Sequence, residues 1–333
     1  MSTSASRSSS TASSVGSNGW PCASPPGEDH RVITLVSAPS NLGLRPPEPG
    51  GVPGSAKAPE ALREAGLFER FALTGARDGG VVLPGRYVDD DATRAPGLVR
   101  NQAALVDHSM RLATRIGDVL ASGRAPLVVG GDCSVLLAAG IATATRGGAG
   151  LVHVDGHTDF RHPGNSDECA SVAGEDLAAA VGLHWPAIAD IDGLSPYFAP
   201  ARTAHIGHRD DDGGAHEARR VLGSVTPASA VTTRGVVPAV TAAKAAAGSG
   251  YWLQVDVDVL DPSVMPAVDS PDPGGLDVAG LAGLLRGLAP DALGASITVF
   301  DPDLDPDGRY ARLLVDLLVD GLSALGSTVH HGP

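Results

Sequence analysis

The sequence has little cysteine, no apolar segment long enough to cross a membrane, and no apolar core of a secretory signal near its first residues. Its three cysteines, Cys22, Cys133 and Cys169, are too few for a disulfide framework. A membrane-spanning helix needs roughly 20 apolar residues in succession, and no run approaches that length. We therefore expect a cytoplasmic protein in a reducing compartment, with no membrane partner.

Basic residues are also scarce. The chain has 24 Lys and Arg residues against 38 Asp and Glu residues, a formal net charge of -14 at pH 7. This excess argues against a nucleic-acid partner, because nucleic-acid binding relies on basic patches that meet phosphates. The acidic composition agrees instead with a small cationic substrate.

Aromatic residues make up only 4% of the chain, whereas Gly (43) and Pro (26) are abundant. With 43% hydrophobic residues, the chain can bury one large core built mainly from Ala, Val and Leu. Residues 1–28 are rich in Ser, Thr, Gly and Pro and show no periodicity, which predicts a disordered tail. Residues 29–333 predict a single domain.

Buried strands alternate with helices along this domain. Apolar runs at 125–129, 150–154 and 251–255 are typical of strands buried on both faces of a parallel sheet. A strand, helix, strand crossover makes the two strands parallel. We therefore expect an α/β fold, a single three-layer αβα domain with a mostly parallel, doubly wound sheet. Further strands are expected at 32–36, within 203–212, where a strand and its mouth are expected, and at 295–300, and helices at 59–67, 101–120, 134–144 and 310–325.

Polar residues follow three of the predicted strands. The three motifs are Gly130-Gly131-Asp132-Cys133-Ser134, Asp155-Gly156-His157-Thr158-Asp159 and Asp256-Val257-Asp258-Val259-Leu260-Asp261-Pro262. In an extended segment, side chains two positions apart point the same way, so the acidic and His side chains of each motif would converge. Carboxylates packed so closely need a neutralising cation, and the ligands exceed what one tetrahedral ion needs. We interpret the motifs as a two-metal site.

Asp residues that cap helices after strands are the alternative interpretation, because α/β proteins use such caps routinely. One motif alone would not separate the two interpretations. Three motifs, each at a strand end, favour the metal site.

Taken together, the three motifs resemble those of the ureohydrolase family, which includes arginase, agmatinase and formiminoglutamase. The family reads Gly-Gly-Asp-His-Ser, Asp-Ala-His-x-Asp and Asp-x-Asp-x-x-Asp-Pro, and Cys133 stands where the family has a metal-binding His. The resemblance extends over about residues 31–327 and implies an arginase-like fold. It also implies a homo-oligomer, a trimer or hexamer.

The resemblance implies a ligand set and two Mn²⁺ ions as cofactors. For the first ion the implied ligands are Cys133, Asp155, Asp159 and Asp256, and for the second they are His157, Asp155, Asp256 and Asp258. Two of these carboxylates and a hydroxide would bridge the ions. The thiolate of Cys133 is softer than the family's His and makes zinc or iron possible at that position. Asp258 or another carboxylate of the site is expected to accept a proton during catalysis.

The resemblance implies that Asp212 and Ser171 contact the substrate, and Asp269, where this chain departs from the family, is a third candidate. Asp212 ends an Ile-Gly-His-Arg-Asp-Asp-Asp run whose last Asp in arginase contacts the substrate α-amino group, although an exposed acidic turn is the alternative. Ser171 lies in the loop whose Ser and Asn meet the substrate carboxylate in arginase. Asp269 adds a carboxylate where the family has small neutral residues.

Two residues of the arginase site are replaced in this chain. Ala173 stands at the position of the proton-shuttling His, and Val299 at that of the Glu that pairs with the guanidinium. His162, in the loop after Asp159, could take over the proton transfer, because His titrates near neutrality. A solvated loop His with no catalytic role is the alternative.

These features predict a binuclear-metal hydrolase that cleaves a C–N bond of a guanidino or amidino compound, arginine-like or N-hydroxyarginine-like, through a metal-bridging hydroxide. Bound metal lowers the pKa of water from 15.7 to about 7 in the best cases, which makes hydroxide available at neutral pH. Two alternatives stay open. One is a zinc-type amidohydrolase acting on acylated amines, as deacetylase relatives do, and the other is a catalytically weak regulatory relative.

Overall fold

Eight strands form one sheet in the order β2-β1-β3-β8-β7-β4-β5-β6, and every neighbouring pair is parallel. The computed structural model describes residues 1–2 and 32–329, so the predicted tail at 1–28 lies outside the described residues apart from its first two. The strands are β1 (Ile33–Ala38), β2 (Arg77–Val81), β3 (Ala125–Gly130), β4 (Leu151–Val154), β5 (Thr203–Ile206), β6 (Ser224–Thr226), β7 (Tyr251–Asp256) and β8 (Ala292–Thr298). The predicted α/β class is confirmed.

The two edge strands are the ones that the sequence pattern does not predict. β2 is polar and mostly exposed, and β6 has three residues that are only partly buried. The inner strands β1, β3, β4, β5 and β7 are buried along their whole length. Only a strand covered on both faces shows the continuous apolar run that predicts it.

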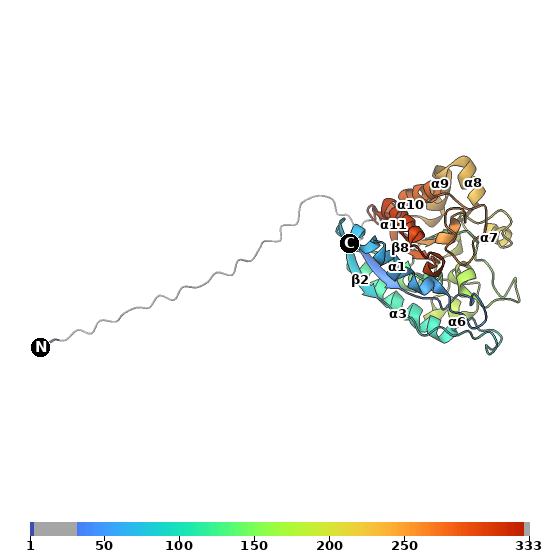
Figure 1. Ribbon diagram of the computed structural model, residues 1–333, viewed down its shortest axis with the longest axis horizontal. Helices are drawn as coiled ribbons and strands as arrows, with labels where there is room; N and C mark the ends of the chain where they lie inside the picture. Colours follow the sequence, from blue (N-terminus) through green and yellow to red (C-terminus); the bar gives the residue numbers. More distant parts are fainter. Residues whose placement is uncertain (3–31, 330–333) are drawn as a thin grey trace.

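Helices cover both faces of the sheet (Figure 1). On one face lie α1 (Ala58–Glu64), α2 (Leu67–Ala72), α8 (Ala228–Arg234), α9 (Val236–Ala247), α10 (Val278–Leu288) and α11 (Arg309–Leu322). On the other lie α3 (Gln102–Ala121), α4 (Val135–Ala144), α5 (Asp176–Ala180), α6 (Pro186–Ala189) and α7 (Ala215–Val221). Each helix layer forms its own hydrophobic core with the sheet, which confirms the expected three-layer arrangement.

One predicted helix is interrupted. The pattern over 59–67 predicts a continuous helix, but α1 ends at Glu64 and α2 begins at Leu67. Gly66 between them has φ 95°, a left-handed conformation that an L side chain rarely adopts. The chain therefore changes direction at this glycine.

The order of the central strands places the three polar motifs together. β3, β8, β7 and β4 are successive neighbours in the sheet. Because they are parallel, their carboxyl ends lie along the same edge, where open α/β sheets bind their ligands. The segments after β3, β4 and β7 therefore meet there.

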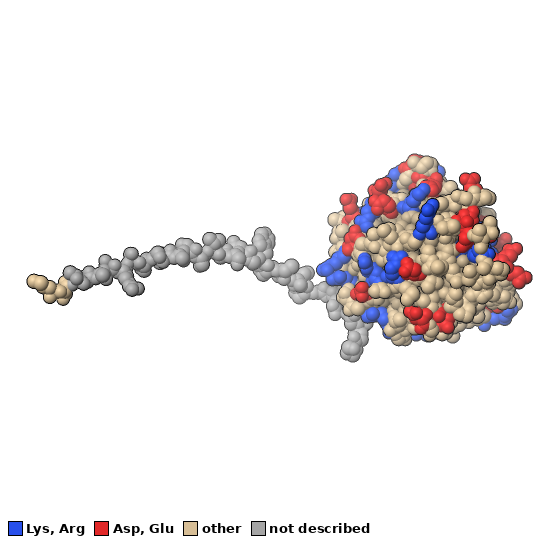
Figure 2. Space-filling model, turned by 90° about the horizontal axis from the view of Figure 1, so that it is seen from below, with Lys and Arg blue, Asp and Glu red and all other residues tan. Residues whose placement is uncertain are grey.

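Charged side chains of both signs are interspersed on the face of the molecule in Figure 2, which also exposes wide uncharged areas. The acidic excess of the chain is thus not concentrated in one patch of that face. Among the described residues, no helix has both the length and the apolar character needed to cross a bilayer.

Candidate metal centre

Three strand ends bring the predicted metal ligands to one place. Cys133 follows β3, and Asp155, His157 and Asp159 follow β4. Asp256 is the last residue of β7, and Asp258 lies in the 3-10 turn directly after it. Parallel pairing of β4 with β7 sets Val154 beside Val255, so the two acidic motifs begin at the same level of the sheet.

The distances show one continuous cluster. Cys133 Sγ lies 2.7 Å from Asp256 Oδ2, and His157 Nδ1 lies 2.9 Å from Asp258 Oδ2. Potential ligand atoms of Cys133, Asp155 and Asp256 lie within 4.8 Å of one another, and so do those of Asp155, His157 and Asp258. Asp155 belongs to both groups and joins them.

Backbone N–H groups orient the carboxylates. Asp155 Oδ1 accepts a hydrogen bond from the N–H of His157 at 2.6 Å, and Asp256 Oδ1 accepts one from the N–H of Asp258 at 2.7 Å. The other oxygen of each carboxylate is left to face the cluster. Asp159 adopts φ 45°, which is uncommon for a residue other than glycine, and a carboxylate oxygen of Asp159 lies within 4.8 Å of Cys133 Sγ.

Burial and like charge disfavour ionisation in the cluster. Burial, followed by the charges of Asp159 and Asp258, raises the pKa of Asp155 well above its ordinary value. Burial also raises the pKa of the Cys133 thiol. His157 behaves oppositely: burial opposes its protonation, but the hydrogen bond and charge of Asp258 outweigh burial and raise its pKa to about 11. The site thus holds more acidic groups than can be ionised together without a further cation.

The donor set fits a pair of metal ions. Asp155 is fully buried, and its Oδ2 atom has no hydrogen-bond partner among the described residues. A cation would neutralise the carboxylates and supply that missing contact. Carboxylates with the His157 imidazole suit manganese, whereas the thiolate of Cys133 favours a softer ion such as zinc or iron.

Close packing holds the strand ends in position. A Cβ atom at Gly131 would lie 1.7 Å from the carbonyl oxygen of Ser40, so only glycine fits there. The buried Arg209 donates hydrogen bonds to the carbonyl oxygens of Asp258 at 2.9 Å and Asp272 at 2.6 Å. Arg209 therefore ties the end of β7 to the loop around residue 272.

A cavity of about 630 Å³ adjoins the cluster. From the cluster, His157, Asp159, Asp256 and Asp258 line it. Its other charged lining residues are the acids Asp212, Glu217 and Asp269 and the bases Arg45 and Arg161. The cavity therefore offers charges of both signs beside the candidate metal centre.

All three predicted substrate-contacting residues line this cavity. Asp212 accepts hydrogen bonds from the N–H and hydroxyl of Thr158, at 2.9 and 2.6 Å, so its carboxylate is held in a fixed orientation. Ser171 donates its hydroxyl to the carbonyl oxygen of Gly43 at 2.6 Å. Asp269 faces the cavity. Desolvation by the surrounding protein, followed by the negative charge of Asp258, raises the pKa of Asp269 to about 7.

The predicted proton carrier His162 is not among the described residues that line the cavity. Its Nε2 atom lies 3.5 Å from Glu217 Oε1, and its Nδ1 atom accepts the N–H of Gly164 at 3.1 Å. Ala173 and Val299, at the positions of the arginase His and Glu, do line the cavity. Val299 has φ 74°, a strained conformation for a β-branched side chain.

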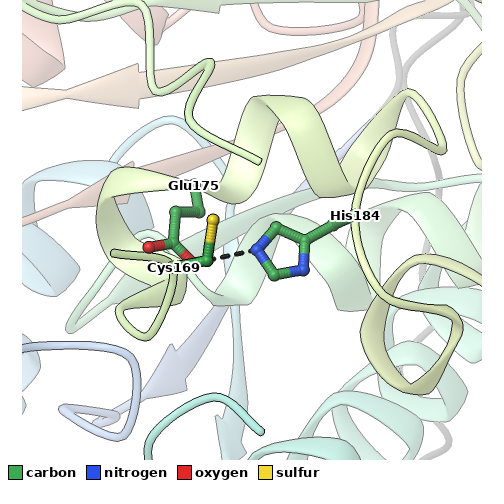
Figure 3. Close-up of side chains that lie close together, drawn as sticks. All are labelled: Cys169, Glu175 and His184. Atoms are coloured by element: carbon green, nitrogen blue, oxygen red, sulfur yellow. Dashed lines mark hydrogen bonds and ion pairs between the residues drawn. The ribbon is translucent and has the colours of Figure 1, made fainter. Parts of the chain in front are cut away.

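The sequence motifs miss a buried anchor of the 160–174 loop, centred on Glu175 (Figure 3). Its carboxylate accepts the N–H groups of Ala170 at 2.9 Å and Ser171 at 3.1 Å and the Nε–H of Arg161 at 3.2 Å. His184 Nε2 lies 3.0 Å from its other oxygen. His184 Nδ1 accepts the N–H of the following residue, so Nε2 carries the proton and donates it to Glu175. Two residues that line the cavity, Ser171 and Arg161, are thus fixed by one carboxylate.

Comparisons with known proteins agree with this geometry. A family model described as "Arginase family" matches residues 33–323. The arginase of Brevibacillus brevis is 28% identical over 302 residues, which covers 87% of this chain and 97% of that protein. The N(omega)-hydroxy-L-arginine amidinohydrolase of Streptomyces lavendulae is 27% identical over 271 residues, covering 81% of this chain and 89% of that protein.

A solved structure shows the same fold. The native arginase from Bacillus caldovelox superposes with a TM-score of 0.77 at 27% identity, covering 89% of this chain and 98% of that one. The match extends over nearly the whole described domain, so it includes the strand ends that hold the cluster.

Proposed function

This chain belongs to the arginase family, and we propose that it is a binuclear-metal hydrolase that cleaves a C–N bond of a cationic guanidino or amidino compound. The observation that carries the proposal is the convergence of four carboxyl groups, a thiol and an imidazole beside a cavity, with a buried oxygen of Asp155 that has no hydrogen-bond partner among the described residues. A protein that used these residues only as helix caps would pair that oxygen with an N–H group.

The residues that would hold the ions form two groups on opposite sides of the cluster, with two carboxylates shared between them. Cys133, Asp155, Asp159 and Asp256 face one, and His157 with Asp155, Asp256 and Asp258 faces the other. When bound, such ions lower the pKa of water and so provide a nucleophile at neutral pH. Asp258 Oδ2, 2.9 Å from His157 Nδ1, is positioned to accept the proton that the attacking water loses.

The cavity charges suit an amino acid with a cationic side chain. Asp212 and Glu217 would receive the α-ammonium group, and Arg161 with the neighbouring Ser171 the α-carboxylate. Asp269, which lines the cavity together with Asp256 and Asp258, would pair with the guanidino end. Each contact would be a charge-assisted hydrogen bond of about 1.5–3 kcal/mol.

Ala173 and Val299 favour a substrate whose reaction depends less on a proton donor. General acid catalysis is typically worth about 10²–10⁴ in rate, and Ala173 supplies none. N-hydroxylation lowers the basicity of a guanidino group and leaves its carbon more open to attack. We propose that N-hydroxyarginine or an amidino compound is a better substrate than arginine. The activity named for the Streptomyces lavendulae relative is of this kind.

Metal analysis of the purified full-length chain, combined with product release over a panel of guanidino and amidino compounds, tests the proposal. Hydrolysis of arginine would release urea and ornithine, and hydrolysis of N-hydroxyarginine would release hydroxyurea and ornithine. At saturating manganese we expect kcat for N-hydroxyarginine to exceed kcat for arginine. An arginine kcat equal to or above that of the hydroxylated compound would contradict the substrate proposal.

The same panel separates the alternative functions. Turnover of acylated amines alone, with zinc bound, would indicate a deacetylase-like amidohydrolase. Bound metal without turnover of any guanidino, amidino or acylated compound would indicate a regulatory relative. The Asp256→Ala variant serves as the control for contaminating activity, because Asp256 contributes to both sides of the candidate metal centre.

A further inference from the structure

Two buried residues outside the three motifs face the metal cluster. His153 lies in β4, and Asp176 begins α5. Both are fully buried. His153 Nε2 lies 3.5 Å from Asp155 Oδ2 and 3.6 Å from Asp176 Oδ1. A carboxylate oxygen of Asp176 is also within 4.8 Å of ligand atoms of Cys133 and Asp159.

Four polar atoms of His153, Asp155 and Asp176 lack hydrogen-bond partners within the described part of the chain. His153 Nε2, Asp155 Oδ2 and both oxygens of Asp176 have no hydrogen bond among the described residues. Leaving a buried polar group unpaired costs about 1–3 kcal/mol, and more when the group is charged, so native structures seldom contain four such atoms side by side. Their unpaired atoms point toward one another, which is the arrangement of a site that binds a cation.

Glu175, the residue before Asp176, differs from it in hydrogen bonding although both lie in the same turn. Glu175 is as deeply buried as Asp176, but N–H donors satisfy both of its carboxylate oxygens. Among the described residues the only ion-pair partner of Asp176 within 4.0 Å is His153. Among the described residues, N–H donors therefore satisfy the Glu175 carboxylate, whereas neither oxygen of Asp176 has a hydrogen-bond partner.

We propose that Asp176 and His153 are additional ligands of the ion on the Cys133 side, referred to below as the inner ion. The inference rests on the proposed binuclear function and deepens it. The inner ion would then be bound by Cys133, His153 and the carboxylates of Asp155, Asp159, Asp176 and Asp256. This mixture of sulfur, nitrogen and oxygen donors suits Zn²⁺ or Fe²⁺, so the two sides of the centre would select different metals.

The environment of His153 agrees with ligation through Nε2. A metal-bound His usually donates its other ring N–H to an acceptor, which fixes the tautomer. His153 Nδ1 lies 3.0 Å from Nδ1 of the buried His205. With Nε2 on the ion, Nδ1 carries the proton and donates it to His205, so the pair makes one good hydrogen bond with no charge on either ring.

The variants Asp176→Asn and Glu175→Gln form a matched pair, because each converts one buried carboxylate of the same turn to an amide. The measurements are zinc and cobalt affinity by chelator competition, the absorption spectrum of the cobalt-loaded protein, and Tm with and without metal. We expect Asp176→Asn to weaken binding of the inner ion at least about tenfold. Replacing a residue that only supports a metal ligand already costs about tenfold or more in metal affinity, and a direct ligand should cost no less. The cobalt spectrum should change with it.

Stability distinguishes ligation from a structural role. Asp176→Asn removes one of several crowded carboxylates, so the Tm of the metal-free protein should not fall, while the Tm gain on adding zinc should shrink. Glu175→Gln should lower Tm and leave inner-ion affinity and the cobalt spectrum unchanged. Unchanged zinc affinity in Asp176→Asn, or a Tm loss that is equal with and without metal, would overturn the proposal.

A zinc-loaded crystal structure of the unaltered chain tests the proposal even if Asp176→Asn does not fold. Zinc at about 2.0–2.2 Å from an Asp176 oxygen and from His153 Nε2 would support it. Zinc bound to Cys133 but not to these two residues would overturn it. None of these measurements uses turnover, so a failure of the guanidino-hydrolase proposal would be seen separately.

Discussion

Replacing Glu175 by Gln should destabilise the protein and loosen the loop that carries Ser171 and Arg161. The Glu175 carboxylate is fully buried and accepts hydrogen bonds from two backbone N–H groups, from Arg161 and from His184. In the variant the amide oxygen can still accept from the backbone. The amide nitrogen would face His184 Nε2, whose proton is fixed there by the hydrogen bond to Nδ1. One buried donor is therefore left unpaired.

The size of the effect follows from these contacts. An unpaired buried donor costs about 1–3 kcal/mol, and the loss of a charged acceptor for Arg161 adds to this, so about 2–4 kcal/mol is expected. With 333 residues at about 2.1 cal/mol/K each, the entropy of unfolding is about 0.7 kcal/mol/K. The midpoint Tm should therefore fall by about 3–6 °C.

The pH dependence provides an independent check. Burial would raise the pKa of Glu175, but the hydrogen bonds from His184, Ala170 and Ser171 prevail and lower it below the ordinary value of 4.5. A lowered pKa in the folded state contributes stability that is present above about pH 4.5 and is lost as the pH falls through the lowered value. Metal-free wild type should lose this increment below about pH 4.5, and Glu175→Gln should not.

Calorimetry of the metal-free proteins measures both effects, and limited proteolysis between residues 160 and 174 reports on the loop. Glu175→Asp is the control, because it keeps the charge but shortens the side chain. A Tm change below about 1 °C for Glu175→Gln, with unchanged proteolysis, would refute the assigned role of this carboxylate as the loop's anchor.

Further predictions concern the metal centre and the cavity. Asp256→Ala should abolish metal binding and activity together, because its carboxylate is proposed to contact both ions; elemental analysis showing two ions retained would contradict this. Asp212→Ala should raise KM about 10- to 100-fold for substrates with an α-amino group, in line with one charge-assisted contact, and an unchanged KM would exclude amine recognition by Asp212. Gly131→Ala should prevent native folding, because the new Cβ would lie 1.7 Å from Ser40 O; a native circular dichroism spectrum and melting curve would show that the chain can relax around it.

The sequence alone determines the parts of this protein that depend on local pattern. Strands β3, β4 and β7 are buried on both faces, so their apolar runs identify them, and the polar motifs that follow must lie at their carboxyl ends. Chain connectivity then makes the sheet parallel. For this reason the α/β class and the family could be inferred from the residues. The edge strands β2 and β6 could not be predicted in this way. They are exposed or only partly buried, so their sequences contain no continuous apolar run.

Only the tertiary structure decides which side chains meet across the sheet. Asp176 follows a long loop and resembles any acidic residue at the start of a helix, yet packing places it 3.6 Å from His153, and neither of its carboxylate oxygens is hydrogen-bonded among the described residues. His162 has the residue type expected of a proton carrier, but the fold sets it beside Glu217, and His162 is not among the described residues that line the cavity. The burial, orientation and hydrogen-bond partners of a side chain depend on contacts between segments far apart in the sequence, so no local sequence pattern encodes them.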